Sequence, residues 1–301
     1  MHRPPRLSAG ARVALVAPAG PLRDQQEVER AIDNARSLGW DTTVSAHASG
    51  RTGYFSGSDA ERLDDFNGAL RDDRVDGIWC LRGGYGSMRL LRGIDYAALR
   101  RHPRALIGYS DITALHCAVQ AECAIVSYHG PTARAAMDDF SRASLTHAVA
   151  HEESCGVASG ARVLRKGRAS GRLAGGNLAL IASLVGTPWA ARLDGAILVL
   201  EDVNEAIYRV DRMFQQLVLS GSLTGCRGII FGECTNCPEI ADGGGSRTLD
   251  EVLTEIADAI DVPCMAGIPL GHIASQWTLP LGSAAELDTD ALTLWTRERD
   301  R

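Results

Sequence analysis

Apolar segments of strand length alternate with helical patterns along this chain of 301 residues, and this alternation limits the possible folds more than any other feature. A chain that repeats strand, helix and strand is expected to form a mainly parallel, doubly wound α/β sheet with helices on both faces. Such sheets bind ligands beyond the carboxyl ends of their strands. In the first half, strands are predicted at 13–17, 41–45, 75–81, 104–108 and 124–128, and helices at 22–38, 59–71 and 111–121.

The chain changes character near residue 134. Residues 135–172 contain few long apolar runs and end in a stretch rich in glycine and basic residues, which favours a connector. We therefore expect an N-terminal α/β domain at 1–134, that connector, and a second, smaller α/β domain at 173–301, with a cleft between the domains. In the second domain, helices are predicted at 177–185, 206–219 and 248–259, and strands at 196–200, 228–232, 262–265 and 284–296.

The composition is that of an ordinary globular protein, with 45% hydrophobic residues, 23% charged residues and a net charge of −6. The negative charge and the lack of a run of lysine or arginine argue against nucleic acid or an anionic membrane as the main partner. The N-terminal apolar stretch is short and reads as a first strand rather than a secretory signal, and no run approaches the length of a membrane span. These features predict a cytoplasmic protein.

The eight cysteines lie mostly within apolar segments, which is typical of reduced thiols in a protein core. Cys234 and Cys237 form the only close pair, and no second pair stands at the spacing of zinc ligands. We therefore expect no metal site.

Ser110 stands where the predicted strand 104–108 ends and a helix begins. A serine on such a turn is held by rigid elements on both sides, and the N–H groups at the helix start can stabilise a developing oxyanion. Serine and aspartate are also common N-cap residues, so a capping role for Ser110 and Asp111 is the alternative. The side chain of Asp111 suits the helix start because its charge complements the helix dipole.

A serine nucleophile needs a histidine base and a carboxylate that orients that base. His129 follows a strand, and His272 lies in a loop rich in glycine and proline, so either is a credible base. Glu201 ends one apolar strand and Glu233 follows another, so either is a credible acid. The residues alone leave both choices open.

The segment RGGYGS at 82–87 is a glycine-rich turn after a strand. It lacks a P-loop lysine and does not fit G-x-G-x-x-G, which argues against a phosphate site. It predicts either a plain tight turn or a loop whose amides face a reacting carbonyl, since Gly83, Gly84 and Gly86 permit positive φ and close approach.

Taken together, these segments resemble a known family. The chain is similar to the LD-carboxypeptidases, serine peptidases that include the microcin-immunity carboxypeptidases. The resemblance covers nearly the whole chain, and the matching blocks are VALVAPAGP, WCLRGGYGSMRLL, LIGYSDITALH, SYHGP, GRLAGGNLALIASLVGTP, ILVLEDVNEAIYRVDRMFQQL, GIIFGEC and GIPLGH.

The resemblance implies a catalytic triad of Ser110, Glu201 and His272, with the oxyanion held by the backbone amides of Gly84 and Asp111. Asp202 is a small departure, because relatives often carry a second Glu there. The implied reaction is release of a C-terminal D-amino acid, D-Ala, from an L,D-peptide bond of cytoplasmic muropeptide tetrapeptides during peptidoglycan recycling. It requires no metal or organic cofactor, and relatives commonly form homodimers.

A carboxypeptidase must also recognise the free terminal carboxylate, a task that suits the bidentate fork of arginine. Arg82, Tyr85 and Arg209 are the expected substrate-binding residues, and Arg212 is a further candidate in a family-like block. The sequence does not choose among the arginines.

Three other functions fit parts of the pattern. An immunity-type enzyme acting on aminoacyl nucleotide analogues would need an aromatic surface for adenine, which Trp189 or Trp277 could provide. A non-catalytic two-domain binding protein would use Ser110 only as a helix cap. An α/β-hydrolase esterase expects G-x-S-x-G, but residue 112 is Ile.

Overall fold

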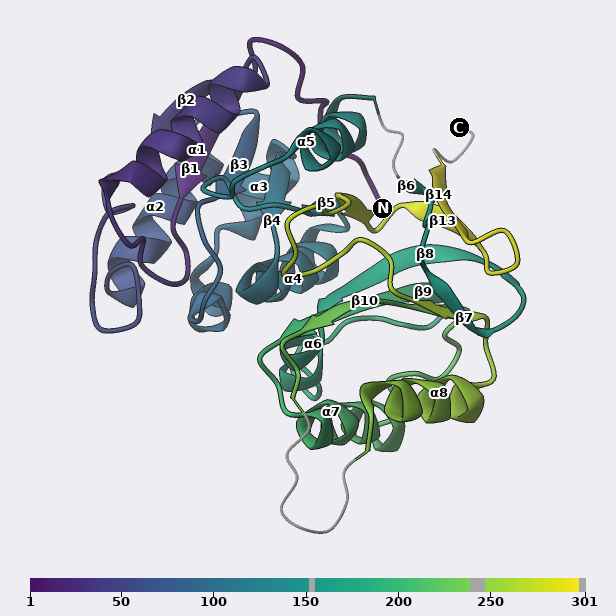
Figure 1. Cartoon of the computed structure of the whole chain (residues 1–301). Coiled ribbons are helices and arrows are strands. Elements are labelled where there is room, and N and C mark those ends of the chain that lie inside the picture. Colours follow the sequence, from purple (N-terminus) through teal and green to yellow (C-terminus); the bar gives the residue numbers. More distant parts are fainter. Residues whose placement is uncertain (152–154, 239–246, 298–301) are drawn as a thin grey trace.

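The structure is a computed structural model that describes residues 1–151, 155–238 and 247–297. These residues form two sheets with helices packed on them (Figure 1). The first sheet has six strands in the order β12-β5-β4-β3-β1-β2, and the second has eight in the order β6-β14-β13-β8-β9-β10-β11-β7. The predicted α/β class is therefore confirmed.

The first sheet is parallel except at one edge, where β12 joins it. Apolar side chains cover both faces of the sheet, so it is doubly wound as predicted. Its strands are β1 (Arg12–Val16), β2 (Asp41–Val44), β3 (Gly77–Cys80), β4 (Ala105–Gly108), β5 (Ser127–His129) and β12 (Leu279–Leu281). One face packs against α1 (Gln25–Ser37) and α5 (Asp139–Thr146), and the other against α2 (Asp59–Arg71), α3 (Tyr96–Arg101) and α4 (Thr113–Cys123).

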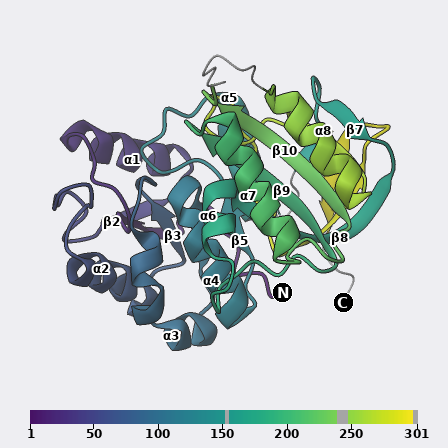
Figure 2. The ribbon, with the colours of Figure 1, turned by 90° about the horizontal axis from the view of Figure 1, so that it is seen from below.

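The second sheet has a parallel centre with antiparallel strands added at its edges. Its helices lie together on one face, and α7 runs along β9 and β10 (Figure 2). The parallel strands are β8 (Arg168–Asn177), β9 (Ala196–Val203), β10 (Gly228–Thr235) and β11 (Cys264–Ala266), and the antiparallel ones are β6 (Cys155–Val157), β7 (Arg162–Arg165), β13 (Ala284–Asp288) and β14 (Thr293–Arg297). The helices are α6 (Leu178–Ser183), α7 (Ile207–Leu219) and α8 (Leu249–Ile260).

The segment 135–172 holds more regular structure than the sequence pattern indicates. It contains α5, the single π-helical turn η3 (His147–His151), β6, β7 and the start of β8. The glycine-rich run before Asn177 hides β8, because glycine supplies no apolar alternation. The domain boundaries themselves stay a prediction.

One apolar cluster runs through both halves of the molecule. It contains Leu115 and Val119 of α4 together with Ile181 of α6 and Leu198 of β9, all buried. The two sheets therefore share a core and pack directly against each other.

A close backbone approach reinforces this contact. A Cβ at Gly176 of β8 would lie 2.5 Å from Oγ1 of Thr113, so only glycine fits there. The backbone N–H of Asn177 donates a hydrogen bond of 2.9 Å to the same Oγ1. The start of α4 is thereby attached to the carboxyl end of β8.

We predict that Gly175→Ala destabilises the protein by about 3 kcal/mol. Gly175 has φ +128°, and a Cβ there would lie 1.9 Å from the carbonyl oxygen of Val199 on the neighbouring strand. Urea unfolding of the purified variant measures the change.

Gly68→Ala is the matched control, because Gly68 lies within α2 with nothing within 4 Å of its added Cβ. It should keep or raise stability, by up to about 1 kcal/mol. Equal unfolding midpoints for the two variants would contradict the packing described for β8.

Candidate active site

Ser110 follows β4 by two residues and opens the short 3-10 turn η2 (Ser110–Ile112) that leads into α4. Its φ is +65°, a conformation that costs a non-glycine residue on the order of 1 kcal/mol. Gly108 and Tyr109 before it are extended, so the chain reverses sharply at the serine. Strain at this position indicates that the turn is built to present the hydroxyl.

Three side chains from distant parts of the chain meet at this turn. Nε2 of His272 lies 3.1 Å from Oγ of Ser110, and Nδ1 of His272 lies 2.8 Å from Oε2 of Glu201. The Glu201 side chain is fully buried, and that of His272 is 20% exposed. The hydroxyl, imidazole and carboxylate therefore form a hydrogen-bonded series with the geometry of a nucleophile, its base and the group that orients the base.

The loop after β11 brings His272 to the carboxylate. Gly271 has φ +120°, and a Cβ there would lie 3.1 Å from Oε2 of Glu201, so glycine allows the close approach. The loop is held on β10 because the backbone N–H of Glu233 donates to the carbonyl of Leu270 over 2.8 Å. Glu233 thus supports the loop through its backbone, while Glu201 contacts the imidazole.

His129, the other candidate base, lies in the interior. Its side chain is buried, and neither ring nitrogen has a hydrogen-bond partner among the described residues. Burial lowers its pKa well below the usual value, so the ring is neutral. The geometry favours His272 over His129.

Two residues that the sequence patterns did not single out brace the site. The ring centroid of Tyr109 is 4.8 Å from that of His272. Nε2 of His116 lies 2.8 Å from the carbonyl oxygen of Gly108, and burial lowers the pKa of His116 to about 4. A neutral His116 therefore holds the end of β4, and Tyr109 limits the movement of the His272 ring. In the sequence, only the position of Tyr109 next to Ser110 could have indicated that Tyr109 belongs to the site.

The glycine-rich loop packs directly on the nucleophile. A Cβ at Gly83 would lie 2.9 Å from Cβ of Ser110, and the carbonyl of Gly83 accepts a hydrogen bond of 2.9 Å from the N–H of Gly20. Gly84 follows the residue that packs on the serine, which is consistent with a loop whose amides face a reacting carbonyl. The assignment of the Gly84 and Asp111 amides to an oxyanion remains a prediction.

The side chain of Asp111 does not cap the helix, which corrects the expectation from the sequence. Its carboxylate accepts from the backbone N–H of Ser87 over 2.8 Å, and Oγ of Ser87 donates to the carbonyl of Asp111 over 2.6 Å. Burial raises the pKa of Asp111, while the bonds from Ser87 oppose the rise. Asp111 therefore ties the glycine-rich loop to the nucleophile turn.

The expected substrate-binding residues lie at different places. Arg82 is half-buried, and its Nη1 donates to the carbonyl of Pro21. Tyr85 is 51% exposed. Arg209 lies on α7, where its guanidinium contacts the hydroxyl of Tyr208 at 3.2 Å. A role in substrate binding stays a prediction for all three.

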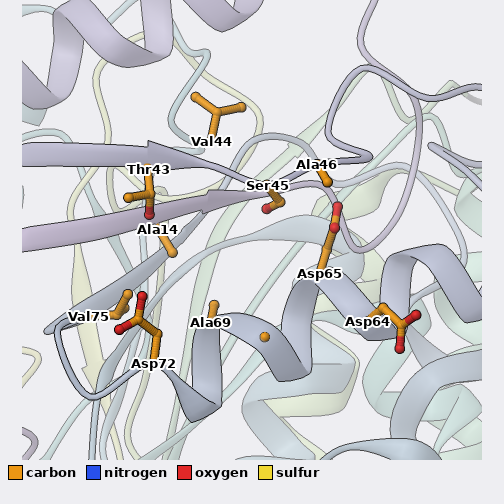
Figure 3. Close-up of a pocket in the computed structure, with 11 residues that line it drawn as sticks. Ala14, Thr43, Val44, Ser45, Ala46, Asp64, Asp65, Ala69, Asp72 and Val75 are labelled. Carbon is orange, nitrogen blue, oxygen red and sulfur yellow. The ribbon is translucent and has the colours of Figure 1, made fainter.

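A separate pocket of about 240 Å³ lies between β2 and α2 (Figure 3). Asp64, Asp65 and Asp72 contribute carboxylates to it, and Asp65 is hydrogen-bonded to Nδ1 of His47 over 2.9 Å. Its lining does not include the triad, so we do not connect it with the chemistry of Ser110.

Within the described residues, no group of three or more His, Cys, Asp or Glu side chains is arranged to hold a metal ion, and no helix has the length and apolar character to cross a membrane.

A serine, histidine and glutamate in hydrogen-bonded order, at the junction of two α/β sheets, define a serine hydrolase. Two family models match the chain: the LD-carboxypeptidase N-terminal domain over residues 13–130 and the LD-carboxypeptidase C-terminal domain over residues 170–287. The chain belongs to the LD-carboxypeptidase family and is a serine-type carboxypeptidase. This membership confirms the resemblance and favours the enzyme over a non-catalytic binding protein.

Individual relatives agree with the family. A murein tetrapeptide carboxypeptidase from Pseudomonas aeruginosa is 34% identical over 302 residues, covering 93% of this chain and 94% of that protein. The microcin C7 self-immunity protein MccF from Escherichia coli is 28% identical over 82% of this chain and 81% of its own. The crystal structure of a muramoyltetrapeptide carboxypeptidase from Oxalobacter formigenes has a TM-score of 0.84 at 28% identity, covering 95% of this chain and 97% of that chain.

We predict that Ser110→Gly is more stable than Ser110→Ala by about 1 kcal/mol. Both variants lose the hydroxyl and its bond to His272, but only alanine keeps a Cβ at φ +65°. Urea unfolding of the two variants side by side measures the difference. Equal stability, or a more stable alanine variant, would show that the turn carries no strain.

A second prediction concerns Asp202, which is 2% exposed and accepts hydrogen bonds from Nδ2 of Asn177 and the N–H of Ala179. Burial raises its pKa to about 6 from the usual 3.8. Because the folded state binds this proton more tightly, the contribution of Asp202 to stability is largest below pH 4 and falls as the pH rises through 6.

Asp202→Asn removes this dependence. The stability of the variant relative to wild type should rise by on the order of 2 kcal/mol between pH 4 and pH 7. Unfolding curves of both proteins at each pH measure the difference, and a difference that stays constant would contradict the prediction.

Proposed function

We propose that the protein is an LD-carboxypeptidase that releases the C-terminal D-Ala from the L,D-peptide bond of muropeptide tetrapeptides, in the cytoplasm, during peptidoglycan recycling. The observation that carries the proposal is the hydrogen-bonded series Ser110, His272 and Glu201, with contacts of 3.1 and 2.8 Å. The relative named as a murein tetrapeptide carboxypeptidase, 34% identical over nearly the whole chain, supports the substrate class. We further propose that the protein acts as a homodimer.

The geometry suggests the following steps. Oγ of Ser110 attacks the carbonyl carbon of the scissile bond as Nε2 of His272 takes its proton. The buried carboxylate of Glu201 accepts a hydrogen bond from the Nδ1–H of His272, which fixes the tautomer and stabilises the imidazolium. The amides of Gly84 and Asp111 bind the oxyanion in our proposal.

The tetrahedral intermediate then collapses. His272 donates its proton to the nitrogen of the leaving D-amino acid, and an acyl ester on Ser110 remains. A water molecule, deprotonated by His272, attacks this ester and releases the shortened peptide with the serine regenerated.

The runner-up function is an immunity-type carboxypeptidase, as named for the relative MccF. Adenine would need an exposed indole, but Trp277 is only 5% exposed, within a core cluster. Trp189 is partly buried and donates from Nε1 to Glu122 over 3.2 Å. Trp277 is therefore closed to a ligand and the indole N–H of Trp189 is already used, which supports the peptide substrate.

The test is incubation of the purified protein with L-Ala-γ-D-Glu-meso-diaminopimelate-D-Ala and, separately, with a processed microcin, followed by mass spectrometry of the products. We expect the tripeptide and free D-Ala from the first substrate. Ser110→Ala should lower kcat by about 1000-fold or more with the fold intact.

Full hydrolysis of the tetrapeptide by Ser110→Ala would refute the nucleophile. Cleavage of the microcin but not of the tetrapeptide would favour the immunity-type function. Equal cleavage of a tetrapeptide ending in L-Ala would refute the L,D specificity.

A further inference from the structure

The terminal carboxylate of a carboxypeptidase substrate must lie close to the nucleophile. Only a nitrogen and one α-carbon separate the scissile carbonyl carbon from the carboxylate carbon, so these two atoms are within about 4 Å. A paired guanidinium adds about 4 Å more. The group that recognises the carboxylate must therefore stand within roughly 8 Å of the carbon that Ser110 attacks.

Arg82 stands next to the nucleophile turn in the chain, because it precedes Gly83, the residue that packs on Ser110. Its Nε lies 4.0 Å from the place a Cβ would take on Gly84, so the arginine side chain runs beside the glycine-rich loop. The bond from Nη1 to the carbonyl of Pro21 anchors one end of the guanidinium.

Arg134 is a second arginine beside the glycine-rich loop, and no sequence motif marks it. The backbone N–H of Ala133 donates to the carbonyl of Cys80, two residues before Arg82, over 3.0 Å. Its Nη1 contacts Oε1 of Glu27, whose side chain is 6% exposed. Nδ2 of Asn34 donates to the carbonyls of Ala133 and Ala135 over 2.7 and 2.8 Å, which fixes the backbone on both sides of Arg134. Within the described residues, Nε of Arg134 is buried and has no hydrogen-bond partner. Arg134 is therefore held rigidly with donor capacity to spare.

Further arginines lie near Arg82. Burial first, and then the charge of Arg134, lowers the pKa of Arg82, with Arg23 and Arg51 adding to the effect and Glu27 opposing it. Hydrogen bonds place the last two arginines nearby: Nη2 of Arg51 donates to the carbonyl of Leu22 over 2.7 Å, and the backbone N–H of Arg23 donates to Oε2 of Glu27 over 2.8 Å.

Arg134 also connects this cluster to the triad. Its charge reaches Tyr109, where it opposes the rise in pKa that burial causes. The ring centroid of Tyr109 lies 4.8 Å from that of His272, so a residue that feels the charge of Arg134 is in contact with the imidazole beside Ser110. A carboxylate of the substrate next to Ser110 would be attracted to these guanidinium groups.

We propose that Arg82 and Arg134 form the subsite for the terminal carboxylate of the substrate, and that Arg23 and Arg51 extend it into a positive rim suited to peptides with further carboxylates. This assignment rests on the proposed function. It makes Arg82 and Arg134 the specificity-determining residues that restrict cleavage to the last peptide bond.

The experiment compares the tetrapeptide ending in free D-Ala with the same peptide ending in D-alaninamide, which keeps the scissile bond and removes the terminal charge. Wild type should prefer the acid in kcat/KM. Arg82→Gln and Arg134→Gln should each lower kcat/KM for the acid by about 30-fold or more and change that for the amide by less than about threefold, so that the preference collapses.

Arg36→Gln is the control, because Arg36 lies on α1 in an exposed pair with Asp33 and outside the cluster. It should keep the wild-type preference. Arg134→Gln leaves Glu27 buried without its partner, so the double variant Glu27→Gln/Arg134→Gln, which removes both members of the pair, is measured beside it. Thermal unfolding verifies that each variant is folded.

Folded variants of Arg82 and Arg134 that retain the wild-type preference for the acid would overturn the subsite while leaving the proposed function intact. A wild-type protein that cleaves neither peptide would overturn the proposed function, and this assignment with it.

Discussion

The contact between Thr113 and the end of β8 is the constraint on which the active site depends. In the proposed mechanism the nucleophile follows a strand of the first sheet, the acid lies on a strand of the second, and the base lies in the loop that joins the two sheets. The site therefore exists only when the two sheets are docked in one position. Thr113 follows Ser110 by three residues and accepts a hydrogen bond from Asn177. Asn177 is in turn the register partner of Glu201 on β9. One hydrogen bond and one strand pairing therefore relate the nucleophile to the carboxylate, and the absent side chain of Gly176 permits the approach.

Three buried carboxylates near this junction have different tasks because their partners differ. Glu201 faces an imidazole, so it can stabilise the charge that His272 acquires during catalysis. Asp111 accepts from the backbone of Ser87 and holds the glycine-rich loop on the nucleophile turn. Asp202 accepts from Asn177 and fixes β8 against β9. Three carboxylates that are all buried therefore differ in role: Glu201 contacts the imidazole, Asp111 holds the glycine-rich loop, and Asp202 holds two strands together.

Much of this arrangement could be predicted from the sequence. The rest could not, and the reasons are physical. The alternation of apolar strands and helices indicates the parallel sheets, and Ser110 stands out as a polar residue at a strand-to-helix turn. The residues alone could not choose His272, because a local pattern holds no information about a contact 162 residues away along the chain. The resemblance to the family supplied that choice.

Two other features could not be predicted from the sequence pattern, and each has a physical reason. The strand β8 was hard to predict because its glycines allow neighbouring atoms to approach closely. Glycine has no side chain, so the segment shows no alternation of apolar and polar residues. Arg134 has no motif because its position depends on Glu27 and Asn34, which are remote in sequence. Tertiary contacts, rather than local propensity, determine both.

The position of β12 affects the order in which the parts of the protein can fold during synthesis. It pairs with β5 and so covers the edge of the first sheet, although it lies near the end of the chain. During synthesis the N-terminal domain emerges first, with β5 as an open edge and Ser110 without its base. His272 and β12 then emerge within a few residues of each other. The nascent chain therefore closes its first sheet and gains the base proposed for Ser110 together, and a chain that ends before residue 272 lacks the imidazole that contacts the Ser110 hydroxyl.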